Sequence, residues 1–174
     1  MKTLIVGMGE VGVALLGVLK NYHPVCIDVN GQLRETEETF EIMHIAFPYS
    51  ENFVQQVKEY QEKYEPKYTV VHSTVKPGTC AQVGAVHSPI IGIHPFLEQG
   101  IRTFTKFLGG EKASEVANYF RRAGLRVYTF DKAVTSELMK LLDTTFYALC
   151  VEYTKSIKRL TDQHGVPFEA WSVY

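Results

Sequence analysis

The stretch Leu4-Ile5-Val6-Gly7-Met8-Gly9-Glu10-Val11-Gly12 decides the fold of this chain. Its apolar start predicts a buried strand, and residues 11–19 that follow have apolar side chains at helical spacing. In a strand–turn–helix unit Gly7 permits the tight turn, Gly9 lets backbone approach a pyrophosphate, and Gly12 lets the helix pack close to the sheet. The unpaired N–H groups and the dipole at the start of the helix favour an anion. The motif therefore predicts a dinucleotide-binding turn.

The next strand is predicted over residues 24–29 and carries an acidic residue near its end, Asp28. Asp28 follows the first glycine by about 20 residues, where a carboxylate accepts hydrogen bonds from an adenosine ribose diol. No Lys or Arg directly follows Asp28 to neutralise a 2′-phosphate. The sequence thus predicts NAD rather than NADP as the cofactor. The predicted cofactor-binding residues of this unit are Gly7, Met8, Gly9, Glu10, Val11, Gly12 and Asp28.

The composition is that of an ordinary globular protein: 174 residues, 45% hydrophobic and 21% charged, with a formal net charge of −1. This balance predicts no nucleic-acid partner and no anionic-membrane partner. Cys26, Cys80 and Cys150 are widely spaced, which indicates reduced thiols rather than disulfides or metal ligands, and no metal site is predicted. No stretch has the pattern of a signal peptide or a membrane span, so we expect a cytoplasmic protein.

Apolar runs along the rest of the chain predict an α/β fold with a Rossmann-type, doubly wound, mostly parallel sheet. The polar stretch of residues 30–39 is too short for the helix and third strand of a full Rossmann half, so the fold is expected to be shortened after the second strand. Residues 87–100 are interpreted as irregular. Strands are predicted over 40–47, 68–72, 83–86, 104–108 and 127–130, and helices over 50–64 and 114–122.

A single long helix is predicted from Val134 to His164, ended by Gly165 and Pro167. At 1.5 Å per residue it is about 45 Å long, which is not a compact arrangement in one small domain. The predicted domains are residues 1–132, which bind the dinucleotide, and residues 133–174, the long helix with its tail. Because the helix must bury its apolar side chains, a homodimer formed along it is expected. Those side chains include Leu138, Leu141, Leu142, Leu149, Ile157 and Leu160.

Several motifs beyond the glycine turn follow one another in a specific order. They are Ala46-Phe47-Pro48, Ser73-Thr74-Val75-Lys76-Pro77-Gly78-Thr79, His87-Ser88-Pro89, Leu108-Gly109-Gly110 and Glu137-Leu138-Met139-Lys140-Leu141. This order resembles the UDP-glucose/GDP-mannose dehydrogenase family, within the wider 6-phosphogluconate-dehydrogenase-like group, from Met1 to about Trp171. The resemblance implies an NAD-dependent dehydrogenase that acts on the CH–OH group of a small anionic or sugar-nucleotide substrate.

The resemblance also implies roles for individual residues. Pro48, Ser73 and Thr74 would lie along the cofactor, with Thr74 at the reaction centre, and Lys140 would face the substrate. A cation there would stabilise an oxyanion that develops during hydride transfer. The alternatives are that Thr74 only bonds loop backbone and that Lys140 is a solvated helix residue.

A second resemblance is local to residues 86–96, where Gly92-Ile93-His94-Pro95 is similar to the Gly-x-His-Pro segment of prephenate dehydrogenases. It implies that His94 accepts a proton from the substrate hydroxyl, a role that suits a side chain whose pKa lies near working pH. The alternative is a histidine hydrogen-bonded within a loop. His72 and His87 are weaker candidates, and His23, His44 and His164 are interpreted as structural or exposed.

Some positions depart from the family pattern. An asparagine usually follows the helix lysine by one turn, where this chain has Thr144, and the family's Asn-Glu pair is replaced by Lys155-Ser156. None of the three cysteines has the glycine-rich context of the family's catalytic cysteine, and the sequence stops at Tyr174, so four-electron oxidation is not expected. A non-catalytic NAD-binding module, a subunit of a larger enzyme, or a piece of a longer dehydrogenase are the other hypotheses. The candidate cations for a substrate anion are Lys76, Arg102, Lys106 and Lys140, which are alternatively surface charges.

Overall fold

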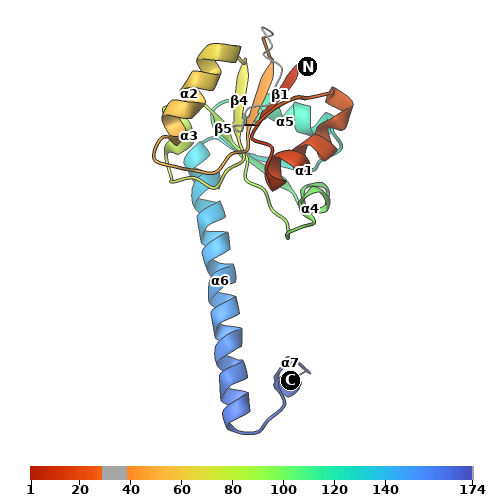
Figure 1. The fold of residues 1–174 in the computed structure, drawn as a ribbon, viewed down its shortest axis with the longest axis vertical. Coiled ribbons are helices and arrows are strands. Elements are labelled where there is room, and N and C mark those ends of the chain that lie inside the picture. The colour runs from red at the N-terminus through yellow and green to blue at the C-terminus, as the bar shows by residue number, and fades with distance from the viewer. Residues whose placement is uncertain (29–38, 174) are drawn as a thin grey trace. The chain divides into compact units, whose positions relative to one another are not determined.

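In the part of the chain that the structure describes, residues 1–28 and 39–173, seven strands form one sheet (Figure 1). The structure is a computed structural model. The strands are β1 (Thr3–Val6), β2 (Val25–Ile27), β3 (Ile42–Ile45), β4 (Tyr68–Val71), β5 (Val86–His87), β6 (Lys106–Gly109) and β7 (Val127–Phe130). Their order across the sheet is β2-β1-β3-β4-β5-β6-β7. Only β5 and β6 pair antiparallel among these strands, so the predicted mostly parallel sheet is confirmed.

Helices cover both faces of the sheet, as in a doubly wound fold (Figure 1). Two separate apolar clusters fill the space beneath them. One lies under α1, α4 and α5, and the other under α2 and α3. The helices are α1 (Glu10–Leu19), α2 (Phe53–Tyr64), α3 (Thr79–Gln82), α4 (Leu97–Thr103) and α5 (Ala113–Arg122), with a 3-10 turn, η1 (Lys20–Tyr22).

The central strands are apolar along their whole length because both of their faces are buried. On β1, Ile5 belongs to the cluster under α1, while Leu4 and Val6 belong to the cluster under α2. In register with Ile5, β3 places His44 on the face that α1 and α5 cover. An imidazole therefore sits in the middle of a buried strand.

The order in which strands are added reverses at β1. It pairs with β2 on one side and with β3 on the other. Thr3 is paired with Ile42 and Val6 with Ile45. Among the described residues no strand lies beyond β2, which agrees with the predicted shortening of the fold after the second strand. Nearly all of the polar stretch on which that prediction rested falls in residues 29–38, outside the described residues.

Besides the one-turn helix α3, two helices of the described residues were not predicted from the sequence. The interpretation of residues 87–100 as irregular is wrong at its end, because α4 begins at Leu97. Gly100 interrupts the helical pattern there, but its role is a close contact: a methyl group at this position would come within 2.6 Å of Gly92 Cα. The second helix, α7 (Phe168–Val173), occupies the stretch interpreted as a tail.

By its internal contacts the chain divides into two units, Met1–Leu138 and Met139–Tyr174. The long helix α6 (Ala133–Gln163) begins in the first unit and continues into the second, close to the predicted range. The second unit exposes many of its large apolar side chains. Of the helices in the described part of the chain, none combines the length and the apolar character that crossing a membrane requires.

Candidate functional site

The glycine turn after β1 has the geometry that its sequence predicts. Gly7 has a φ of +96°, which side chains other than glycine rarely adopt, and its N–H donates to the Ile27 carbonyl at 2.6 Å. A methyl group on Gly7 would come within 2.7 Å of the Phe47 nitrogen. The turn is therefore fitted between the ends of β2 and β3, at the point where the strand order reverses. In open α/β sheets this point is where ligands bind.

The other two glycines of the motif have opposite surroundings. A Cβ on Gly12 would overlap the Gly7 carbonyl oxygen, so this glycine lets α1 pack against the turn. Around Gly9, which precedes α1, an added Cβ would meet no described atom within 4 Å. Gly9 makes no side-chain cap, so it leaves the N–H groups of the first turn of α1 to other acceptors. Gly9 thus faces open space at the end of a helix that favours anions.

A cavity of about 450 Å³ lies against this turn. It includes the carboxylate-bearing Asp28 at the end of β2 and the segment that follows β3. Seven of the predicted cofactor-binding residues line it, whereas Gly12, Ser73 and Thr74 do not. The lining residues are Gly7, Met8, Gly9, Glu10, Val11, Asp28, Ala46, Phe47 and Pro48.

Asp28 is half-buried at the cavity. The negative charge of Asp28 acts on Tyr60 of α2. Burial is the main cause that raises the pKa of the Tyr60 hydroxyl, and the carboxylate of Asp28 contributes in the same direction. The carboxylate therefore lies at the end of β2, close enough to α2 to act on the Tyr60 hydroxyl.

The loop of residues 73–79 is tied to the cavity wall by Ser73. The Ser73 hydroxyl donates to the Phe47 carbonyl at 2.5 Å, and Phe47 lines the cavity. The neighbouring Thr74 is exposed. Ser73 is thus a positioning residue of this loop in the structure, while the side chain of Thr74 is accessible from solvent.

Glu137 is a functional candidate that the sequence reasoning did not single out. Its side chain is fully buried at the start of α6, and its two carboxylate oxygens accept the N–H groups of Gly78 at 2.5 Å and Cys80 at 2.8 Å. Burial, and then Glu137, raise the pKa of the Cys80 thiol, which stays protonated. The signal was present in the sequence, because a lone acidic residue on the apolar start of a helix needs buried donors.

His94 lies beside the cavity. Its Nδ1 contacts the carboxylate of Glu10, the first residue of α1 and a residue of the cavity lining. The side chains of both are about two-thirds exposed, at 67% and 68%. The structure thus brings His94 and the glycine turn together.

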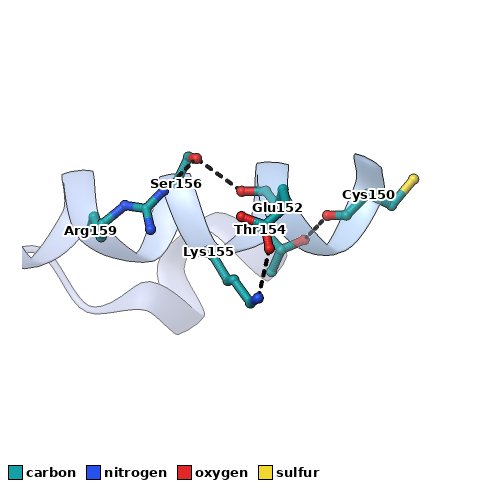
Figure 2. A network of polar contacts seen from close by, with 6 residues as sticks. All are labelled: Cys150, Glu152, Thr154, Lys155, Ser156 and Arg159. Atoms are coloured by element: carbon teal, nitrogen blue, oxygen red, sulfur yellow. Dashed lines mark hydrogen bonds and ion pairs between the residues drawn. The ribbon is translucent and has the colours of Figure 1, made fainter. Parts of the chain in front are cut away.

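Lys140 belongs to the second unit and is half-buried on α6. One turn further along, the Thr144 hydroxyl donates to the Lys140 carbonyl at 2.9 Å. Lys155 and Ser156, which stand where the family has an Asn-Glu pair, likewise form hydrogen bonds within the helix, as Figure 2 shows. The Lys155 ammonium donates to Glu152 at 2.7 Å, and the Ser156 hydroxyl donates to the Glu152 carbonyl at 2.9 Å.

The remaining candidate cations have different surroundings. Lys76 is exposed, and Arg102 pairs with Glu98 and donates to the Gly17 carbonyl at 2.9 Å. Lys106, considered in the sequence as an anion-binding or surface charge, is neither: it is only 3% exposed, inside the sheet layer. Among the described residues no three His, Cys, Asp or Glu side chains gather as metal ligands would.

No protein-family model matches the sequence, and no curated protein sequence matches it. Solved structures do resemble the fold. The UDP-D-ManNAc dehydrogenase of Pyrococcus horikoshii matches 98% of this chain with a TM-score of 0.83 and 15% identity. The UDP-N-acetyl-mannosamine dehydrogenase of Staphylococcus aureus matches 92% with a TM-score of 0.65 and 17% identity. The chain spans 56% of the length of each of these two dehydrogenases.

A reductive aminase from Aspergillus terreus, solved in complex with NADPH, matches 98% of this chain. Its TM-score is 0.67 at 13% identity, and the chain spans 68–69% of such reductase chains. These likenesses confirm the fold that the motifs predict, including its continuation into a long helix.

Proposed function

We propose that this chain is an NAD-dependent oxidoreductase that acts on the CH–OH group of a small anionic or sugar-nucleotide substrate. The cavity at the glycine turn is the observation that carries the proposal. It combines open space around Gly9, the start of α1, whose N–H groups favour an anion, and the carboxylate of Asp28 at the end of the second strand. These three features suit a pyrophosphate and a ribose diol.

The cofactor would be held by the glycine turn and by Asp28, and its nicotinamide end would lie towards Pro48, Ser73 and Thr74. When bound, the nicotinamide supplies the hydride acceptor for oxidation of an alcohol. We assign NAD rather than NADP because a carboxylate at position 28 accepts hydrogen bonds from a ribose diol and repels a 2′-phosphate. The NADPH of the Aspergillus reductase makes direct comparison of the two cofactors the decisive experiment.

In the proposed reaction His94 takes the proton from the substrate hydroxyl. Glu10 contacts the Nδ1 atom of His94, which would keep a proton on that nitrogen and leave Nε2 to act as the base. Thr74 would contact the reacting hydroxyl, and Lys140 would stabilise the oxyanion that develops as the proton leaves.

The substrate class rests on the family resemblance. It is supported by the names of two structural neighbours, which are dehydrogenases of UDP-activated amino sugars. The proposed substrate is therefore an alcohol that carries a phosphate or another anion.

A non-catalytic NAD-binding module is the second candidate. Thr144 favours it, because its hydroxyl is bonded to the backbone of its own helix where the family has an amide side chain. In such a module the cofactor would bind with no turnover.

We further propose a homodimer formed along α6. On the second unit Leu142, Phe146, Leu149, Tyr153 and Leu160 recur at helical spacing, and each is more than half exposed. We call these five residues the apolar stripe. A contiguous stripe of this kind is typical of a helix that packs against another. The expected cytoplasmic location remains a prediction.

Calorimetric titration of NAD and NADP into the protein tests the cofactor assignment. We expect NAD to bind and Asp28→Ala to weaken its binding by about 1–3 kcal/mol. Asp131→Ala is the matched control, because Asp131 also follows a strand of the sheet but lines a different cavity. Equal NAD affinity in Asp28→Ala and in the control would refute the site.

Turnover separates the two candidate functions. With UDP-N-acetylmannosamine, UDP-glucose and a set of small hydroxy acids as substrates, an enzyme would form NADH. We expect His94→Ala and Lys140→Ala to lose this activity while they retain NAD affinity. NAD binding with no NADH from any of these substrates would favour the binding module.

A further inference from the structure

A chain of buried polar side chains crosses the core between the sheet and α5. It runs from Lys106 on β6 through His72, which follows β4, and His44 on β3 to Tyr119 on α5. All four are at most 3% exposed. The imidazoles of His44 and His72 lie 3.0 Å apart, from Nδ1 to Nε2, and the Tyr119 hydroxyl is 3.3 Å from His44 Nε2.

The contact with a backbone carbonyl, together with neutral rings, sets the direction of these hydrogen bonds. His72 Nδ1 is 2.7 Å from the Ser88 carbonyl oxygen, so this nitrogen carries the proton and donates it. His72 Nε2 then accepts from His44 Nδ1, and His44 Nε2 accepts from the Tyr119 hydroxyl. These directions require neutral imidazoles, and burial followed by the charge of Lys106 lowers both pKa values, that of His44 to about 3, which keeps both rings neutral.

Lys106 closes the chain at the Ser88 end. Its ammonium donates to the carbonyl oxygens of Ser88 at 2.8 Å and Pro89 at 2.9 Å, and lies 3.3 Å from His72 Nδ1. These contacts join two stretches of the candidate site. His72 immediately precedes the loop of residues 73–79, while Ser88 and Pro89 open the segment that leads to His94.

We propose that Lys106 is a positioning residue, whose ammonium anchors the start of residues 88–94 and thereby sets His94 beside Glu10. The catalytic meaning of this anchor rests on the proposed function, but the anchor itself is measurable without a substrate. Charged donors form the stronger hydrogen bonds, and two carbonyls on successive residues fix the path of the backbone between them.

Apolar contacts also hold this segment, and they supply the competing explanation. Ile90 is buried in the core, and Gly92 packs closely against Gly100 of α4. If these contacts alone placed the segment, an uncharged side chain of similar length at position 106 would leave it unchanged. Lys106→Met separates the two explanations.

The experiment compares amide hydrogen exchange in the unmutated protein, in Lys106→Met and in Tyr119→Phe. Tyr119→Phe removes a hydroxyl from the far end of the same buried chain and is the control. The Ser88 amide donates to the Val71 carbonyl at 2.8 Å, so its exchange reports on the anchored start of this segment. We expect its exchange to rise by about tenfold or more in Lys106→Met, with β1 and β3 unchanged. In Tyr119→Phe the Ser88 amide should exchange as in the unmutated protein.

An equal rise across all strands in Lys106→Met would show that Lys106 only supports the core, and no rise would show that it is not an anchor. If this variant does not fold, nitrogen NMR of the unmutated protein replaces it. A slowly exchanging lysine ammonium with couplings to the Ser88 and Pro89 carbonyl carbons supports the proposal, and its absence overturns it.

The catalytic consequence has its own readout. In the active protein Lys106→Met should lower kcat by about tenfold and leave the KM for NAD within about twofold, because His94 rather than the cofactor turn is displaced. Equal changes in kcat and KM would overturn the positioning role. Failure of the unmutated protein to bind NAD would refute the proposed function, while the exchange result would still decide the anchor.

Discussion

The two units of this chain treat their apolar side chains in opposite ways. In the first unit the large side chains of the strands lie in two buried clusters, and even histidines and a lysine are enclosed and hydrogen-bonded. In the second unit the apolar stripe is exposed, and the polar side chains bond mainly to their own helix (Figure 2). The first unit encloses most of its apolar side chains, whereas the second leaves an apolar surface that suits the proposed dimer.

Gly12→Ala is expected to break the first unit most severely. A Cβ there would overlap the Gly7 carbonyl, so α1 must move, and we expect a loss of about 3 kcal/mol or more in the free energy of unfolding. Gly9→Ala is the matched variant, with open space around the new methyl group and an expected loss within about 1 kcal/mol. Urea unfolding measures both, and equal losses would contradict the different roles of the two glycines.

Acid is expected to weaken the first unit through its buried histidines. The folded-state pKa values of His44 and His72 lie below 6.5, so the unfolded chain binds more protons as the pH falls through this value. We expect the free energy of unfolding to fall by about 1.4 kcal/mol per pH unit for each histidine between pH 6.5 and 5.

The same stabilisation is fully present above pH 7. His44→Gln should reduce the slope by about half, because one of the two histidines is removed. Urea unfolding at pH 7, 6 and 5 provides the measurement, and a stability that does not change over this range would argue against two neutral buried imidazoles.

The second unit gives the smaller effect on folding and the clearer effect on assembly. Leu149→Lys places a charge within the apolar stripe, and we expect the dimer to dissociate at micromolar concentration while the first unit keeps its stability within about 0.5 kcal/mol. Tyr147→Lys is the control, because Tyr147 is equally exposed but lies on the opposite side of α6 from the stripe. Sedimentation that shows a monomer before any substitution would remove the proposed dimer.

The smallest effect is expected at Glu152. The hydrogen bond from Lys155 and then its charge lower the pKa of the Glu152 carboxyl, but both side chains are exposed. Glu152→Gln should leave the free energy of unfolding unchanged within the error of the measurement. A larger loss in thermal or urea unfolding would mean that the polar side of α6 is covered in solution.

The parts of the molecule that local sequence dictates were predictable. The glycine turn and the long helix follow from spacing alone, because each demands particular residues at consecutive positions. The buried network was missed, because its members are distant in sequence and each looks polar by itself. One signal was available. Lys106 is two residues from Leu108, and His72 is two residues from Val70, so each lies on the same inward face as a buried apolar residue.

Glu137 was missed for a related reason. The apolar residues around it signal that it needs buried donors, but those donors are backbone N–H groups on a loop far away in sequence, which no side-chain pattern identifies. The short helix α4 was not predicted because Gly100 is required for close packing against Gly92, and that contact exists only in the folded chain.

The antiparallel junction between β5 and β6 rests on one residue pair, His87 with Gly109, whereas β6 and β7 share four. A sheet with so narrow a junction has a preferred line of partial opening, along which β6, α5 and β7 would separate as one cooperative block. Lys106 lies in that block but binds carbonyls on the other side of the line. Its ammonium therefore links the two sides of this narrow junction, and Lys106→Met is expected to let the block of β6, α5 and β7 open more readily.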